Sequence, residues 1–150
     1  MTLVEVIKAI EYVAIRQPSI NMIVRNDVFR INEKPDARYA IFAWTQGQHN
    51  TSVDSDYINY TFTFFYVDRL KNDRTNQIEV QSVGVQTLDN IIRALDEAGV
   101  YSELNYTFQV FNQRFLDECA GVFCNVTLSV PIASLCAEDL GYVNDDIIIY

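Results

Sequence analysis

YAIFAWTQGQHNTSVDSDYINYTFTFFYV, residues 39–67, contains two segments of alternating side chains on either side of a polar run. In the second segment large apolar residues alternate with polar ones: the apolar set is Ile58, Tyr60, Phe62, Phe64 and Tyr66, and the polar set is Asn59, Thr61 and Thr63. A period of two residues is typical of a β-strand with one buried face. In the first segment both alternating sets are apolar, which predicts a strand covered on both faces. Together the segments predict a long antiparallel hairpin.

The connection between these two strands is polar and lacks the Asn-Gly or Asp-Gly pair of a tight two-residue turn. We therefore expect a longer, mobile loop from Gln46 to Asp56 that is able to reach a neighbouring subunit. A solvated loop without a partner is an equally simple interpretation.

A helix and short strands are predicted before the hairpin. Thr2 and Glu5 have the spacing of a capping box, and an apolar stripe at intervals of three and four residues runs from there toward Pro18. Two short strand candidates follow, Met22–Arg25 and Val28–Ile31, with a turn-prone Asn-Asp pair between them. One bent strand is the alternative for this region.

After the hairpin we expect one long helix from Gln77 to the neighbourhood of Gly99. Helical spacing is clearest over residues 87–97, whereas the β-branched residues and the glycine of residues 77–85 allow helix, strand or both in succession. Two strands close the pattern, one that alternates at Tyr106, Phe108 and Val110 and one that runs through Val122–Val130 and stops at Pro131. We expect these two strands to pair.

The predicted fold class follows from this order of elements. It is an α+β fold, with two helices packed on a mostly antiparallel sheet and a long projecting β-hairpin. A chain of 150 residues fits one domain, 1–150, with a C-terminal tail from about residue 132. A hydrophobic fraction of 49%, with nine Tyr and nine Phe, argues for a folded chain rather than a disordered one.

Charge and cysteine usage narrow the classes of function. Eleven Lys+Arg against twenty Asp+Glu give a net charge of −9, which disfavours tight binding of nucleic acid phosphates. A protein surface past which DNA slides tolerates a negative charge, although an ordinary acidic protein has the same composition.

No signal peptide or membrane span is apparent in the sequence, which predicts a soluble protein made inside the cell. The three cysteines, Cys119, Cys124 and Cys136, predict reduced thiols rather than disulfides or a zinc site.

The sequence carries no signature of a known reaction, so we expect no enzyme, no metal and no cofactor. The one histidine, His49, lies in a polar run, and nucleophile turns and Gly-rich phosphate loops are missing from the sequence. Cys119 lies near Arg114 but has no histidine partner nearby in the sequence. The alternative is a small intracellular binding domain or enzyme whose site is built from scattered carboxylates, with adjacent acids at Asp117-Glu118, Glu138-Asp139 and Asp145-Asp146.

One family resemblance covers about half of the chain. It lies in the order of elements and in four short strings: Asp68-Arg69-Leu70, Phe111–Asp117, Ala120-Gly121-Val122 and the final apolar strand. In these features the chain resembles the tail terminator and head-to-tail neck proteins of tailed bacteriophages. That resemblance implies a structural virion protein in the neck or tail, assembled in the host cytoplasm. It also implies a sixfold or twelvefold homo-oligomeric ring that contacts other neck, portal or tail proteins and lets DNA pass.

With this resemblance, two regions are candidates for contacts between subunits. The hairpin loop would line the channel or meet the next ring, through Gln46, Gln48, His49, Asn50, Asp54 and Asp56. The C-terminal run Ile147, Ile148, Ile149 and Tyr150 would add a strand to the subunit's own sheet or to a neighbour's edge. A third feature, the basic cluster Arg69, Lys71 and Arg74, either docks an acidic patch of a neighbour or is a solvated turn.

Overall fold

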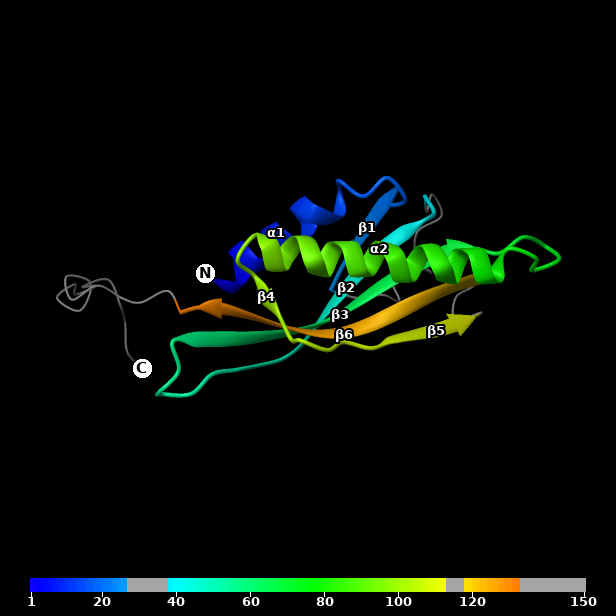
Figure 1. The fold of residues 1–150 in the computed structure, drawn as a ribbon. Coiled ribbons are helices and arrows are strands. Elements are labelled where there is room, and N and C mark those ends of the chain that lie inside the picture. Colours follow the sequence, from blue (N-terminus) through cyan, green and yellow to red (C-terminus); the bar gives the residue numbers. More distant parts are fainter. Residues whose placement is uncertain (27–37, 113–117, 133–150) are drawn as a thin grey trace, which may run out of the picture.

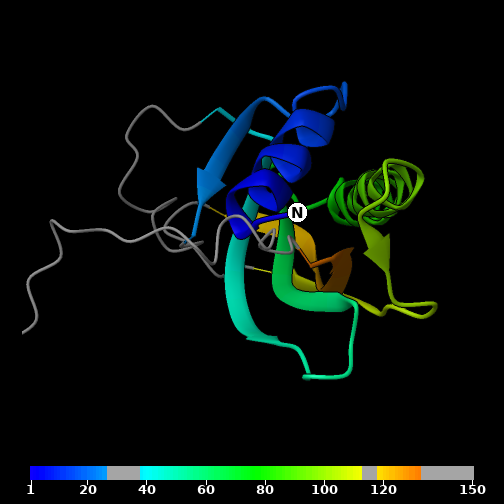
Figure 2. The ribbon, with the colours of Figure 1, turned by 90° about the vertical axis from the view of Figure 1, so that its left-hand side faces the viewer.

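The computed structural model describes residues 1–26, 38–112 and 118–132. Within these ranges the chain forms two helices and six strands, in the order α1 (Leu3–Ala14), β1 (Met22–Arg25), β2 (Ile41–Asn50), β3 (Tyr57–Arg69), α2 (Gln77–Glu97), β4 (Tyr101–Ser102), β5 (Phe108–Asn112) and β6 (Cys119–Pro131). Both helices cover the same face of one sheet (Figure 1), and the view in Figure 2 shows the two layers end on. The predicted α+β fold is therefore confirmed.

The sheet is organised around β3 and β6, which pair antiparallel along their whole lengths from Tyr57↔Pro131 to Arg69↔Cys119. The strand order is β1-β2-β3-β6-β4, and β5 pairs with β6 on the same side as β4. Only β1 is parallel to its neighbour, β2. The expected β5–β6 pairing is confirmed, and the β2–β3 hairpin forms the other half of the sheet.

Helix α1 begins with the predicted capping box. The Glu5 N–H donates to Thr2 Oγ1 at 3.3 Å, and the Thr2 N–H donates to Glu5 Oε2 at 2.6 Å. Its buried residues, Val6, Ile10 and Ala14, recur every four positions and face the sheet. The helix therefore packs with the stripe that the sequence predicts.

Helix α2 is continuous over 21 residues, so the expectation of one long helix is confirmed. It ends beside Gly99, whose φ of +88° is a backbone conformation that glycine adopts without a Cβ clash. In its first half, a Cβ placed on Gly84 would lie 2.9 Å from Tyr66 Cδ1 and from Val122 Cγ2. The helix backbone therefore sits directly on β3 and β6 at this point.

The core has two parts, one on each face of the sheet. The larger part lies between the helices and the sheet and includes Phe42, Phe62 and Phe64. The smaller part lies on the opposite face, at the end of the sheet away from the hairpin tip, and joins five strands through Val24, Ile41, Ala43, Val67, Phe111 and Cys119. All four residues of Ile41–Trp44 are buried, which confirms that the first half of β2 is covered on both faces.

The prediction of a loop from Gln46 to Asp56 is wrong for the first half of that range. Gln46–Asn50 belongs to β2, where His49 pairs with Tyr60 and Asn50 with Asn59 after a β-bulge. The connection is therefore residues 51–56. Among the described strands, β1 pairs with Ile41–Trp44 and the rest of β2 pairs with β3 alone. Most side chains in this second part of β2 are exposed, so its composition resembles that of a loop although its backbone is paired.

Two smaller points concern element bounds. The short strand β4 (Tyr101–Ser102) was not expected, and the strand expected to include Tyr106 begins at Phe108.

Several predicted features lie outside the described residues: the strand candidate Val28–Ile31, most of Phe111–Asp117, Cys136 and the run Ile147–Tyr150. Among the described helices, neither combines the length and apolar character that crossing a membrane requires.

Candidate functional site: the distal hairpin and the groove beside β1

The distal end of the β2–β3 hairpin projects beyond the layer of helices (Figure 1). Five of the six residues predicted there as contacts are exposed, and the sixth, His49, is half-buried. The structure thus brings Gln46, Gln48, His49, Asn50, Asp54 and Asp56 together on one projecting element. At its tip Val53 is fully exposed, an apolar side chain that sequence reasoning passed over because it stands alone among polar neighbours.

His49 is engaged in structural contacts. The Thr61 N–H donates to His49 Nδ1 at 3.2 Å, and His49 Nε2 lies 3.0 Å from Gln46 Oε1. Because a backbone N–H only donates, Nδ1 must accept, so in the neutral ring the proton is on Nε2 and is donated to Gln46. The ring also packs on Tyr60 with centroids 5.1 Å apart. These contacts use both nitrogens to hold the bulge of β2.

The turn at the hairpin tip is closed by local hydrogen bonds. The Ser55 N–H donates to Ser52 O at 3.1 Å, and Thr51 Oγ1 donates to Tyr57 O at 2.7 Å. The carboxylates of Asp54 and Asp56 are exposed beside Val53. The tip is therefore an ordered turn that presents one apolar and two acidic side chains to the outside.

The sheet face opposite the helices carries a ladder of uncharged polar side chains near the hairpin. Thr63 Oγ1 donates to Asn125 Oδ1 at 2.7 Å, and Ser129 Oγ donates to Asn59 Oδ1 at 2.5 Å. Thr61 and Thr127 lie between these pairs, with their hydroxyl oxygens 3.4 Å apart. This face of the sheet is apolar at the end away from the hairpin tip and becomes polar and uncharged toward the hairpin. The alternation in β3 predicts the polar part for Asn59, Thr61 and Thr63.

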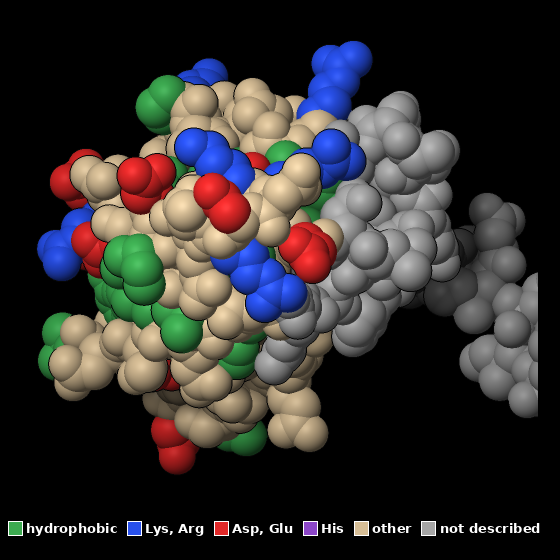
Figure 3. Space-filling model, turned by 90° about the vertical axis from the view of Figure 1, so that its right-hand side faces the viewer, with side chains coloured by type: hydrophobic (Ala, Val, Ile, Leu, Met, Phe, Trp, Pro, Cys, Tyr) green, Lys and Arg blue, Asp and Glu red, His purple; other side chains and the backbone are tan. Residues whose placement is uncertain are grey.

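The predicted basic cluster lies where β3 leads into α2, at the end of the molecule shown in Figure 3. Positive and negative side chains are interspersed there. Arg74 Nη2 is 3.3 Å from Glu118 Oε1, and the Arg69 guanidinium lies over the Tyr39 ring at 4.9 Å. Docking of this cluster on an acidic neighbour remains a prediction, and the structure shows two of its three cations in contacts within the chain.

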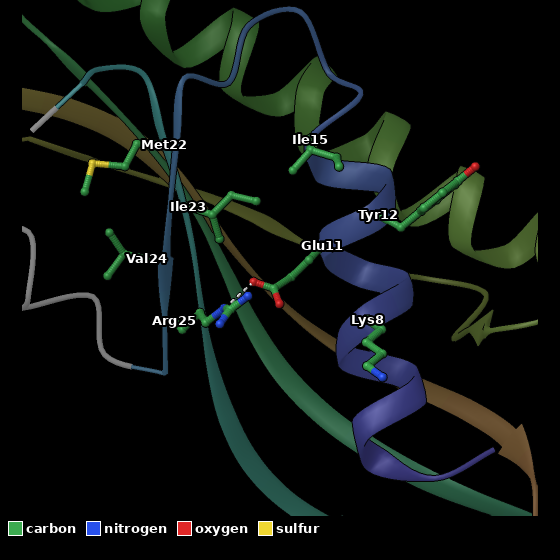
Figure 4. Close-up of a pocket in the computed structure, with 8 residues that line it drawn as sticks. All are labelled: Lys8, Glu11, Tyr12, Ile15, Met22, Ile23, Val24 and Arg25. Carbon is green, nitrogen blue, oxygen red and sulfur yellow. Dashed lines mark hydrogen bonds and ion pairs between the residues drawn. The ribbon is translucent and has the colours of Figure 1, made fainter.

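A groove of about 610 Å³ separates α1 from β1. Its helical wall is the stripe Lys8, Glu11, Tyr12 and Ile15, at intervals of three and four residues, and its other wall is Met22–Arg25. Figure 4 shows Ile23 and Arg25 pointing toward α1, and Met22 and Val24 pointing to the other face of the sheet. The ion pair between Arg25 Nε and Glu11 Oε2, 2.7 Å long, crosses the groove.

The groove was not predicted, although a signal for it exists in the sequence. Lys8 and Glu11 form a second stripe on α1 beside the buried one, and the exposed Ile15, the residue that caps the helix, continues it. A stripe of mixed character on an amphipathic helix is usually solvated, and only its position beside β1 makes it one wall of a groove.

Metal-binding clusters and cysteine thiols are the two kinds of reactive group that the described residues allow us to assess. Within residues 1–26, 38–112 and 118–132, no group of three or more His, Cys, Asp or Glu side chains is placed to hold a metal ion. Cys119 and Cys124 are both buried, and burial raises the pKa of the Cys124 thiol to about 11, so its reactive thiolate is scarce at neutral pH.

Comparison of the sequence with models of known protein families, and with curated proteins, finds no match.

Proposed function

We propose that this chain is a structural virion protein, one subunit of an oligomeric ring in the neck or tail terminator of a tailed bacteriophage. The ring joins head and tail and lets DNA pass. The sequence resemblance supports this proposal, and so does a fold whose two helices cover one sheet face and leave a paired hairpin projecting on the other side.

The observation that carries the proposal is the tip of that hairpin. Val53 is fully exposed at the far end of an ordered, projecting element, beside Asp54 and Asp56. Burying a valine side chain contributes about 1.5 kcal/mol or more when a partner covers it. The carboxylates beside it repel DNA phosphates, which suits an element at the edge of a channel through which DNA moves without adhering.

The first test is the mass of the purified protein over a wide concentration range, with negative-stain images of the same samples. Rings of six or twelve subunits are expected at high concentration. A strict monomer at the highest soluble concentration, with no ring in the images, would count against the proposal.

A matched pair of variants tests the hairpin contact. Val53→Asp places a third carboxylate on the tip and is expected to weaken assembly at least about tenfold, because it removes an apolar contact worth more than about 1.4 kcal/mol. Leu104→Asp is the control, since Leu104 is almost fully exposed in the β4–β5 connection. Equal effects of the two variants would show that the tip makes no ring contact.

A further inference from the structure

A second cavity, a pocket of about 360 Å³, lies where the α1–β1 connection, the end of β3 and the first half of α2 meet. The connection is tied to α2 by a hydrogen bond of 2.8 Å between the hydroxyls of Ser19 and Thr87. The volume of the pocket is within the range of small-ligand sites. Its walls are partly apolar and partly polar, and the polar side chains decide which ligand fits.

The hydroxyl of Tyr66 opens into this pocket without a partner. The Tyr66 side chain lines the pocket and is only 2% exposed, and its hydroxyl makes no hydrogen bond to the described residues. Among those residues, Trp44 Nε1 is the one side-chain nitrogen or oxygen that is both fully buried and unpartnered. The Tyr66 oxygen is therefore open to the pocket, and a buried hydroxyl of this kind calls for a hydrogen-bonding ligand.

Asp68 supplies a carboxylate beside this hydroxyl. It lies two residues after Tyr66 on β3, so both side chains are on the same face of the strand. Asp68 Oδ1 accepts from the Arg69 N–H at 2.8 Å, and Oδ2 has no hydrogen bond from the described residues. Burial raises the pKa of the Asp68 carboxyl, and burial together with the Asp68 charge raises the pKa of Tyr66 to about 12. The phenol thus keeps its proton at neutral pH and lies close enough to sense the carboxylate.

The charge of the pocket selects a cation. Its described lining contains two carboxylates, Asp68 and Glu79, and neither Lys nor Arg. The guanidinium of the neighbouring Arg69 lies over the Tyr39 ring, 4.9 Å from its centroid. Glu79 is in the first turn of α2 and offsets the positive end of that helix. A half-buried carboxylate without a cation is stabilised when a ligand brings one.

The free acceptors favour an ammonium over a guanidinium group. A guanidinium binds best to both oxygens of one carboxylate, and one oxygen of Asp68 is already engaged. An ammonium group is a compact charge with three N–H donors, which suits one carboxylate oxygen and one phenol oxygen. The apolar wall of Pro18, Ala40 and Val83 suits a short alkyl stem.

We propose that this pocket binds a primary alkylammonium group, which donates to Asp68 Oδ2 and Tyr66 Oη and rests its stem on the apolar wall. A free amine and the lysine side chain of another protein share this chemistry. The inference does not depend on the ring proposal, because one subunit contains the whole pocket.

Titration of the full chain at neutral pH, followed by NMR at the amides of Ala40 and Val83, tests the binding. Butylammonium chloride is expected to cause saturable shifts with a Kd of about 1 mM. Butyrate and butanol have similar sizes and should bind at least about tenfold more weakly, because neither brings a positive charge. Nα-acetyl-lysine amide is the second probe: if it also binds, lysine side chains are included among the ligands, and if butylammonium alone binds, the ligand is a free amine.

Two variants and a matched control locate the site. Asp68→Asn keeps the shape of the side chain and is expected to raise the Kd at least about tenfold. Asp54→Asn changes the net charge equally at the exposed hairpin tip and should leave the Kd unchanged. Tyr66→Phe is expected to raise the Kd about threefold without lowering the free energy of unfolding, because its hydroxyl has no partner to lose.

Four results would overturn the proposal. Shifts that do not saturate would show that no amine site exists. Equal effects of Asp68→Asn and Asp54→Asn would show that the amine follows net charge alone. Butyrate that binds as tightly as butylammonium would assign the pocket to the N-terminus of α2. Tyr66→Phe that destabilises the fold and leaves the Kd unchanged would make that hydroxyl structural.

Discussion

At the scale of single residues, Gly121 lies where the sheet leaves no room for a side chain. A Cβ at this position would overlap the carbonyl oxygen of Tyr66 and would lie 2.7 Å from Phe111 Cζ. We expect Gly121→Ala to lower the free energy of unfolding by about 3 kcal/mol, because the clash is partly with backbone and cannot be relieved by a rotamer change. Urea denaturation measures the loss.

Gly99→Ala is the matched control for that substitution. Gly99 has a positive φ, and a methyl group added to it would meet no atom of the surrounding structure within 4 Å. The change is therefore expected to cost only about 1 kcal/mol of backbone strain. A loss at Gly121 no larger than the loss at Gly99 would contradict the close approach of β3, β5 and β6.

Asp89 makes the stability depend on pH. Burial raises the pKa of its carboxyl, but hydrogen bonds from Tyr106 Oη at 2.5 Å and Arg93 Nε at 2.8 Å outweigh burial, so the pKa lies below its usual value. A folded-state pKa below the unfolded value stabilises the protein at neutral pH. That contribution disappears as the pH falls below about 4 and through the lowered folded-state pKa.

The variant Tyr106→Phe tests this coupling. At pH 7 it is expected to cost about 1 kcal/mol of unfolding free energy, since it removes a hydrogen bond to a carboxylate. The difference from the wild type should shrink as the pH is lowered below about 4. Tyr101→Phe, at an exposed tyrosine of β4, is the control. A difference that stays constant with pH would show that Tyr106 acts by packing alone.

At the scale of elements, the packing of α2 on the sheet depends on Gly84. Replacing it with leucine improves helix propensity by almost 1 kcal/mol, but the new side chain has Tyr66 and Val122 in its way. We expect the steric cost of this overlap to exceed the gain in helix propensity, so that Gly84→Leu destabilises the protein by about 2 kcal/mol. Ser82→Leu, at an exposed position of the same helix, is the control. Thermal unfolding followed by circular dichroism measures both, and a stabilising Gly84→Leu would contradict the packing.

At the scale of the whole molecule, the net charge of −9 acts on any assembly of identical subunits. Like-charged subunits repel each other, and salt screens that repulsion over a Debye length of about 10 Å at 0.1 M. We expect ring assembly to strengthen as the salt concentration rises, measured by sedimentation over a salt series. Assembly that weakens with salt would show instead that ion pairs between subunits, such as contacts of the basic cluster, dominate the interface.

The elements themselves could be predicted from the sequence because their signals are local. The capping box of Thr2 and Glu5, the alternation in β3 and the long helical period of α2 each depend on residues close together in the chain. The same alternation separated the buried face of β3 from its polar one. The α+β class followed from these signals, as did the exposed position of the hairpin residues.

Only the tertiary structure decided which elements meet. The β3–β6 pairing joins residues far apart in the sequence, and the end of β2 is a strand because its backbone pairs with β3 while its polar side chains remain exposed. The groove needs α1 and β1 side by side, and the constraint on Gly121 needs three strands at once. Local patterns report which face of an element is apolar, whereas partners, edges and grooves depend on contacts that no single segment contains.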